Sequence, residues 1–182
     1  MNEIETKIIN IDIDLIRKKL LEIGAIKVKE ENQINNIFDF SDKRLLNKKG
    51  YARIRIIDNL LNNTTLCYMT TKKMLSQEKY KIMEENEVQI SNAEEGKNIF
   101  LALGLELIHS VKKYRESYKY KETLVEIDIN DKEFCPFPYI EIESSKEDEL
   151  LEVVHLLGYT IDDTTSKTIN EILEDKGVIK GI

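Results

Sequence analysis

The chain has 182 residues, of which 41% are hydrophobic and 34% are charged, and its formal net charge is −7. This length is enough for one domain with a substantial core and is short for two, so we expect a single domain over residues 1–182. The negative balance argues against a general nucleic-acid binder, which normally carries an excess of Lys and Arg. A local basic pocket is still compatible with it.

No targeting or membrane signal is found in the sequence. The first residues carry neither the basic nor the apolar region of a signal peptide. No apolar run approaches the roughly 20 residues of a membrane span. Cys67 and Cys135 are accompanied by no CxxC or Cys/His cluster, which favours buried free thiols in a reducing compartment. We therefore expect a cytoplasmic protein with no membrane partner.

In chain order, the first predicted element is a strand in which charged and apolar residues alternate. Alternate side chains share a face, so Glu3, Glu5 and Lys7 lie on one side and Ile4, Thr6 and Ile8 on the other. A helix over about 14–23 follows and ends at Gly24. About four strands come next, with a tight turn at 48–50, a hairpin connection at 58–64 and a loose polar segment at 73–78.

The second half of the chain repeats the order of helix and strands. A capping-box pattern at 91–94 opens a helix that ends at Gly104, and about three strands follow it. A third helix is expected from near residue 144 or 145 to Gly158, and a fourth over about 164–174. The later strands also alternate, with these charged pairs on one face: Arg53 and Arg55; Lys79, Lys81, Glu85 and Glu87; Lys113 and Arg115; Glu126 and Asp128; Glu141 and Glu143.

The alternation allows two orientations of these strands. In an open antiparallel sheet the charged face meets solvent and the isoleucines pack on a core. In a closed barrel the charged face lines the interior, and the isoleucines lie outside beneath amphipathic helices. Burying an ion costs several kcal/mol against a net stability of about 5–15 kcal/mol. A charged barrel interior would therefore have to be wide, hydrated and neutralised by opposite charges or bound ions.

An ordered series of motifs resembles the CYTH superfamily, the triphosphate tunnel metalloenzymes. The opening Glu3-Ile4-Glu5-Thr6-Lys7 resembles the family's Glu-x-Glu-x-Lys strand, and Arg53-Ile54-Arg55 resembles its Arg-x-Arg strand. The remaining matches are Gln33 to Asp39, Thr70-Thr71-Lys72, Glu85-Asn86-Glu87, Lys113-Tyr114-Arg115 with Tyr118, Val125 to Asp128, and Ile140 to Glu143. Met83 stands where relatives often carry an arginine, so Lys79 or Lys81 would supply that charge.

The resemblance implies an α+β fold: a closed or nearly closed eight-stranded antiparallel β-barrel with helices packed outside. It also implies a small-molecule triphosphate substrate, Mg²⁺ or Mn²⁺ as cofactor, and a monomer or homodimer. Arginine grips phosphate oxygens with two donors and lysine acts as a point charge. The expected substrate-binding residues are Lys7, Arg53, Arg55, Lys72, Lys81, Lys113 and Arg115; the expected metal ligands are Glu3, Glu5, Glu126, Asp128, Glu141 and Glu143; the expected catalytic residues are Glu5, Arg55 and Glu141.

Three functions fit this expected site. The first is hydrolysis of the terminal phosphate of an inorganic, thiamine or nucleoside triphosphate. The second is conversion of ATP to cyclic AMP and pyrophosphate, as in class IV adenylate cyclases. The third is binding of a polyphosphate or nucleotide without turnover. We favour hydrolysis, because water needs no element that recognises a base. His109 and His155 belong to no matched motif and are interpreted as structural or surface residues.

Overall fold

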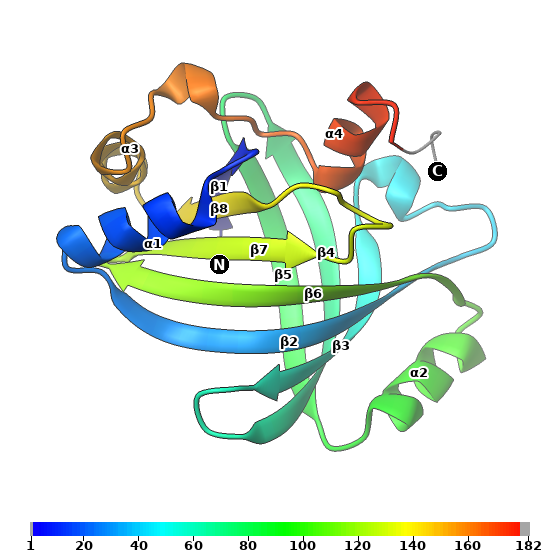
Figure 1. Cartoon of the computed structure of the whole chain (residues 1–182). Coiled ribbons are helices and arrows are strands. Elements are labelled where there is room, and N and C mark those ends of the chain that lie inside the picture. Colours follow the sequence, from blue (N-terminus) through cyan, green and yellow to red (C-terminus); the bar gives the residue numbers. More distant parts are fainter. Residues whose placement is uncertain (1, 179–182) are drawn as a thin grey trace.

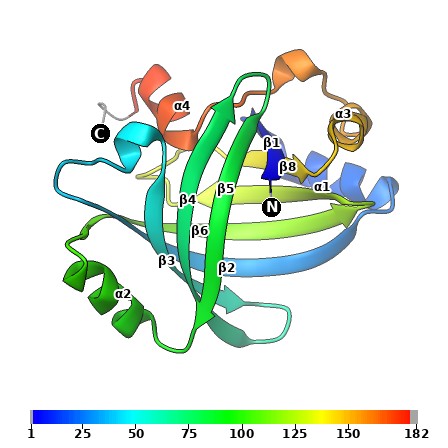
Figure 2. The same ribbon diagram turned by 180° about the vertical axis from the view of Figure 1, so that it is seen from behind.

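A closed antiparallel β-barrel forms the centre of the computed structural model, which describes residues 2–178, with side chains from residue 4 onward. The strand order around the barrel is β1-β5-β4-β3-β2-β6-β7-β8 (Figures 1 and 2). The strands are β1 (Asn2–Ile9), β2 (Ile26–Asp39), β3 (Tyr51–Asn59), β4 (Thr64–Gln77), β5 (Lys81–Ile90), β6 (Glu106–Tyr120), β7 (Thr123–Asn130) and β8 (Tyr139–Ser144). The predicted eight-stranded barrel is confirmed.

Strand β1 closes the barrel. Glu5 of β1 lies opposite Lys81 of β5 on one side and opposite Glu143 of β8 on the other. Closure leaves the sheet without a free edge, where unpaired N–H and C=O groups would invite pairing with another chain. It also brings the first strand of the chain against the last, so that motifs far apart in the sequence share one interior.

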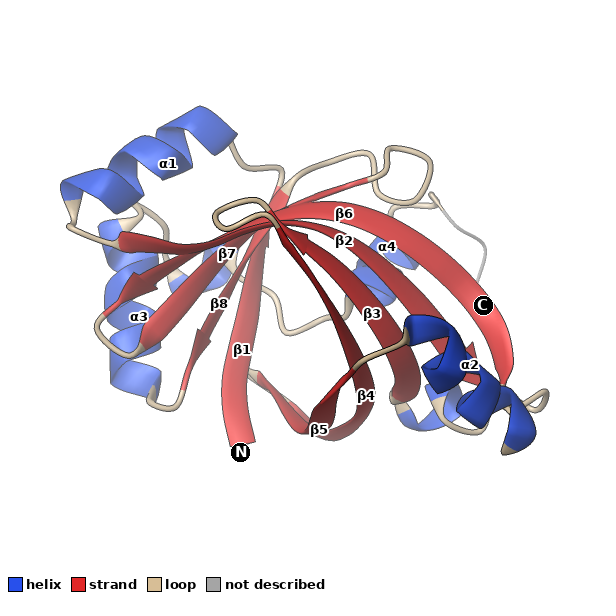
Figure 3. Cartoon of the chain, turned by 90° about the horizontal axis from the view of Figure 1, so that it is seen from below, coloured by secondary structure: helices blue, strands red, loops and turns tan. Residues whose placement is uncertain are grey.

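Within the described residues, four α-helices pack on the outside of the barrel (Figure 3): α1 (Ile13–Glu22), α2 (Ala93–Ala102), α3 (Glu147–Leu156) and α4 (Ile169–Asp175). The apolar faces of α1 and α3 bury Leu20 and Leu150 against the outward side chains Val125 and Ile140. Helix α2 packs Phe100 on the outer face of β3. Val125 and Ile140 therefore face the helices, and the next residues along these strands, Glu126 and Glu141, point into the barrel interior.

Local signals in the sequence set the helix ends. The side chain of Asn92 accepts hydrogen bonds from the backbone N–H groups of Glu94 and Glu95, which caps α2. Gly24 and Gly104 adopt positive φ angles of 80° and 86° directly after α1 and α2. A residue with a β-carbon is strained there, so these glycines end the helices as expected.

Helix α4 begins later than the predicted residue 164. Thr165 is extended and exchanges two backbone hydrogen bonds with Lys7 of β1, each 2.9 Å long. This pairing outcompetes a helical turn, and α4 starts only after Thr168, whose side chain caps it together with Glu171. The helix predicted over 164–174 was therefore too long at its N-terminal end.

One predicted loop also differs. Residues 73–78 were expected to be a loose segment, but β4 continues to Gln77 because Lys73 and Met74 pair with Glu84 and Met83 of β5. The turn at 48–50 is the end of a short 3₁₀ helix, Leu46–Lys48. The hairpin at 58–64 is present between β3 and β4.

Cys67 and Cys135 are free thiols, the first half-buried and the second buried.

Outside the barrel, Glu116 of β6 anchors α1. Its carboxylate is only 1% exposed and accepts hydrogen bonds from Arg17 of α1, Tyr114 and Tyr118. Burial raises the pKa of Glu116, but the hydrogen bonds from Arg17 and the two tyrosines outweigh burial and set it at about 2, against an ordinary 4.5. The sequence did not indicate this residue, since it looks like one more surface glutamate.

We expect Glu116→Gln to lower the free energy of unfolding at pH 7 by roughly 3 kcal/mol, at 1.36 kcal/mol per pKa unit. The folded protein holds the Glu116 proton less tightly than the unfolded chain. This stabilisation is therefore complete above about pH 4.5 and is lost as the pH falls towards 2. Urea denaturation of both proteins between pH 7 and pH 2 measures the difference. A gap that stays constant with pH would contradict the assignment.

Candidate functional site

A cavity of about 750 Å³ occupies the barrel interior, and side chains from all eight strands line it. The predicted site residues that reach it are Glu5, Lys7, Arg53, Arg55, Lys72, Lys81, Lys113, Arg115, Glu126, Glu141 and Glu143. These residues come from segments throughout the chain and meet because alternate positions of every strand point inward. The interior is therefore a shared, strongly polar compartment.

One group of charges joins β1, β5 and β8. Lys7, only 2% exposed, forms ion pairs with Glu5 and with Glu141, the second at 3.1 Å. Lys81 reaches the same Glu5 oxygen at 2.5 Å. Glu5 is thus held between two ammonium groups, and Lys7 connects it to the acidic strand β8.

Arg115 is the centre of a second group on β6, β7 and β8. It makes two hydrogen bonds to Asp128, of 2.6 and 2.5 Å, and further ion pairs with Glu126 and with Glu141, the latter at 2.8 Å. Lys113 lies 2.8 Å from Asp128 as well. Asp128 is fully buried, so these two cations are what allow it to stay charged.

A third group forms a basic wall on β3 and β4, with its counter-charges on β5. Arg53 contacts Glu85 at 3.2 Å and Glu87 at 3.4 Å, while Arg55 contacts Glu87 at 2.7 Å. Lys72 lies 2.7 Å from Glu85. The paired glutamates hold the cationic heads on one side of the cavity, where they form a wide surface of N–H donors.

Two carboxylates of the cavity, Glu5 and Glu141, are kept ionised by neighbouring cations. Burial by itself raises the pKa of Glu141, but Lys7, Arg115 and Lys113 outweigh burial and hold it well below its ordinary value. Burial likewise opposes ionisation of Glu5. The charge of Lys7, together with that of Lys81, outweighs burial and lowers the pKa of Glu5. Both groups therefore offer charged oxygens at neutral pH.

Several cations of the cavity are not fully neutralised. Burial and the neighbouring Arg115 lower the pKa of Lys113. Burial and Lys7 lower that of Lys81, and burial with Arg53 lowers that of Arg55. Each cation lies close enough to another for mutual repulsion to count. A bound polyanion would relieve this repulsion.

Helix α4 lies at one end of the barrel (Figure 1), and residues of α4 and of the segment before it line the cavity. Glu171 of α4 pairs with Lys49 at 2.8 Å and accepts a 2.7 Å hydrogen bond from Gln77. Thr168, Asn170 and Glu174 also border the cavity. These contacts hold the C-terminal part of the described chain over the barrel interior.

Among the described side chains, two that were named from the sequence, Asp128 and Lys79, do not line this cavity. Asp128 is fully buried in its contacts with Lys113 and Arg115, which it orients. Lys79 precedes β5 and pairs with Glu147 on the exterior at 2.6 Å, so Lys81 is the inward lysine. The side chain of Glu3 is outside the described part of the structure, although its backbone lies opposite Met83. Met83 itself borders the cavity.

Sequence reasoning missed other lining residues. His109 was interpreted as structural or surface, but it borders the cavity together with Asn35, Tyr51 and Lys49. Asn35 and His109 share the inward parity of the charged residues on β2 and β6, and this parity was the signal that could have revealed them. Neither residue belongs to one of the alternating charged pairs, so the alternation pattern did not indicate them as site residues.

The carboxylates have the chemistry for a divalent metal. Mg²⁺ and Mn²⁺ prefer oxygen ligands, and Mg²⁺ is commonly held by one or two carboxylates together with substrate phosphates. Between residues 2 and 178 no three acidic, His or Cys side chains are grouped so as to hold an ion by themselves. Glu5, Glu141 and Glu143 border the same cavity, and they fit a metal that shares its coordination with a bound phosphate group.

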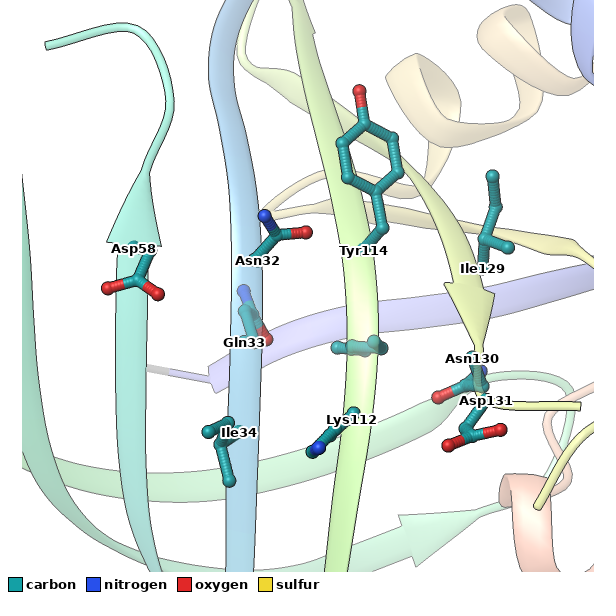
Figure 4. A pocket seen from close by; sticks show the side chains of 10 residues that line it. Asn32, Gln33, Ile34, Asp58, Lys112, Tyr114, Ile129, Asn130 and Asp131 are labelled. Carbon is teal, nitrogen blue, oxygen red and sulfur yellow. The ribbon is translucent and has the colours of Figure 1, made fainter. Parts of the chain in front are cut away.

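A second, shallower hollow of about 410 Å³ lies on the outer face of β3, β2, β6 and the end of β7 (Figure 4). Among its lining residues, Asn32, Asp58, Lys112 and Asp131 are exposed to solvent. These exposed polar groups point in different directions in Figure 4 and do not converge on one point. We therefore place the candidate site in the barrel interior.

A closed antiparallel barrel with rows of Arg, Lys and Glu facing a common interior defines a charged-tunnel class of protein. The CYTH domain family matches residues 1–168, and the chain belongs to this family.

The comparisons with known proteins agree with this assignment. A protein of Methanocaldococcus jannaschii, named a candidate adenylate cyclase, is 26% identical over 94% of this chain and 98% of its own length. The solved structure of the PH1012 protein of Pyrococcus horikoshii is 26% identical, with a TM-score of 0.75 over 91% of this chain and 96% of its own.

A second similar structure comes from Hippeastrum and is described as a candidate adenylyl cyclase with a dominant triphosphatase activity. Its TM-score is 0.68 over 97% of this chain and 95% of its own, at 16% identity, which supports the fold alone. Over residues 2–178, no helix has the length and apolar character needed to cross a membrane.

Proposed function

We propose that the protein is a metal-dependent enzyme that binds a triphosphate inside the barrel and hydrolyses its terminal phosphate. The observation that carries the proposal is the cavity itself. Six basic side chains line this cavity, and acidic side chains lie between them. The six are Arg53, Arg55, Lys72, Lys81, Lys113 and Arg115. A triphosphate carries about four negative charges and is processed mainly by positioning and electrostatic stabilisation.

The proposed roles follow from the geometry. Arg53 and Arg55 present guanidinium groups from one wall and would grip non-bridging phosphate oxygens. Lys81 and Lys113, whose pKa values are lowered by burial and by neighbouring cations, gain most from an incoming anion. The guanidinium group of Arg115 already contacts the carboxylates of Glu126, Asp128 and Glu141, so Arg115 would mainly position Glu141. Single-domain organisation over residues 1–182 and a cytoplasmic location belong to the same proposal.

Glu5, Glu141 and Glu143 are the proposed residues for holding Mg²⁺ or Mn²⁺, with Glu126 close by and Glu3 as a further candidate from the sequence. When bound, such a metal neutralises phosphate oxygens and lowers the pKa of a coordinated water. The protein's part is to keep Glu5 and Glu141 ionised, which Lys7 does by contacting both.

A second candidate function keeps the site and changes the nucleophile: the ribose 3′-hydroxyl of ATP attacks the α-phosphorus and releases pyrophosphate. The name of the M. jannaschii relative, similar over nearly its whole length, favours this alternative. Binding without turnover is the third. Incubation with Mg²⁺ or Mn²⁺ and either tripolyphosphate or ATP separates them: phosphate indicates hydrolysis, cyclic AMP the cyclase, and bound ligand without product the binder.

We expect Glu5→Gln to reduce turnover by about 10- to 100-fold or more, because an uncharged amide takes one carboxylate partner from both Lys7 and Lys81 and removes a proposed metal ligand. Steady-state phosphate release measures the effect, with Glu147→Gln as the matched control. Glu147 pairs with Lys79 outside the barrel, so its variant should keep the wild-type rate. Equal rates for all three proteins would remove Glu5 from the site.

A further inference from the structure

The cavity wall formed by β2 and β6 carries polar atoms that the charged network does not use. Asn35 is 93% buried, and its side-chain oxygen Oδ1 has no hydrogen-bond partner within residues 2–178. On the next inward pair of the two strands, the Nε2 atom of His109 is also buried and, among the same residues, unpartnered. Leaving such atoms without partners costs about 1–3 kcal/mol each, which suggests that a ligand satisfies them.

A relay of side chains fixes which end of the Asn35 amide faces the cavity. The carboxylate of Glu31 accepts hydrogen bonds and cannot donate them, so Gln33 turns its Nε2 towards it, at 2.6 Å. The Oε1 of Gln33 then faces the next inward residue and accepts from Nδ2 of Asn35, at 3.4 Å. The free atom of Asn35 must therefore be Oδ1, an acceptor. The orientation of the Asn35 amide is therefore set by Glu31, four residues away.

The position of this acceptor relative to the basic wall matters. Asn35 lies directly opposite Arg55 in the β2–β3 pairing and opposite Val111 in the β2–β6 pairing. Ile37, Val111 and His109 border the cavity on the same wall. A ligand whose phosphates contact Arg53 and Arg55 would thus place its attached group against a partly apolar surface with one oriented acceptor.

We propose that this wall recognises the heterocyclic part of the substrate, and that Asn35 selects an N–H donor such as the exocyclic amino group of adenine. The inference rests on the proposed function and narrows the substrate from any triphosphate to an amino-bearing nucleoside triphosphate. Inorganic tripolyphosphate offers no group to this wall. Inosine triphosphate presents a carbonyl oxygen at the corresponding place, where it would meet Oδ1 with two acceptors facing each other.

The test measures binding by calorimetry with ATP, inosine triphosphate and tripolyphosphate, each with Mg²⁺. We expect the wild-type protein to bind ATP about tenfold or more tightly than inosine triphosphate. Asn35→Leu keeps a similar volume without the acceptor and should abolish this preference, while its affinity for tripolyphosphate stays unchanged. An ATP-to-inosine triphosphate ratio near one in the wild type would overturn the inference.

Gln33→Leu tests the relay separately. It leaves Asn35 in place but frees its amide to rotate, so the preference for ATP should fall although the acceptor is still present. A merely structural role of Gln33 would lower affinity for all three ligands alike, and retention of the full preference would contradict the relay. The proposed function fails differently: none of the three ligands would bind, in any variant, whereas failure of the inference leaves tripolyphosphate binding intact.

Discussion

Replacement of Arg55 by alanine is expected to reduce kcat/KM for the triphosphate by about 10²- to 10³-fold, as for the loss of one preorganised donor to a developing charge. Arg55 faces the cavity, and its repulsion by Arg53 is the kind that a bound polyanion relieves. Its removal should leave the fold largely intact. Its partner Glu87 keeps a contact with Arg53 and a 2.7 Å hydrogen bond from Thr70.

Phosphate release at varied substrate concentration, together with the thermal midpoint of unfolding, separates these two effects. Arg44→Ala is the matched control, because Arg44 is 59% exposed and pairs with Asp42 outside the cavity. Its variant should retain the wild-type kcat/KM. If Arg55→Ala and Arg44→Ala have the same kcat/KM, Arg55 does not contact the substrate.

Replacement of Arg115 by leucine is expected to act on stability. The substitution removes the main counter-charge of Asp128, which is fully buried, and one partner each of Glu126 and Glu141. Breaking a buried ion pair by removing one partner costs about 3–5 kcal/mol, a large part of a typical net stability of about 5–15 kcal/mol. Urea denaturation at pH 7 measures the loss.

Arg115→Lys keeps the charge without the planar fork that contacts Asp128 with two donors, so its loss of stability should be intermediate. This variant keeps the experiment informative if Arg115→Leu does not fold. Arg44→Ala should leave the free energy of unfolding almost unchanged, as is usual for an exposed pair. A loss this small for Arg115→Leu would mean that Asp128 is stabilised by Lys113 alone.

The sequence by itself determined most of the strands, the identity of their charged faces and most of the charged residues that line the cavity. Alternation with a period of two places Arg53 and Arg55 on one face whatever the tertiary structure does. The helix ends at Gly24 and Gly104 could also be predicted from the local sequence, because glycine by itself allows the positive φ angle that ends each helix. Features that depend only on residue spacing within one segment, such as strand faces and helix ends, were therefore predictable.

Only the tertiary structure decided what depends on distant segments meeting. The period of two cannot say whether the charged face looks inward or outward; closure by β1 between β5 and β8 decides that. The late start of α4 depends on Thr165 pairing with Lys7, more than 150 residues away in the sequence. The free acceptor of Asn35 and the burial of Asp128 arise in the same way, since partners and burial are properties of the assembled barrel and not of any one strand.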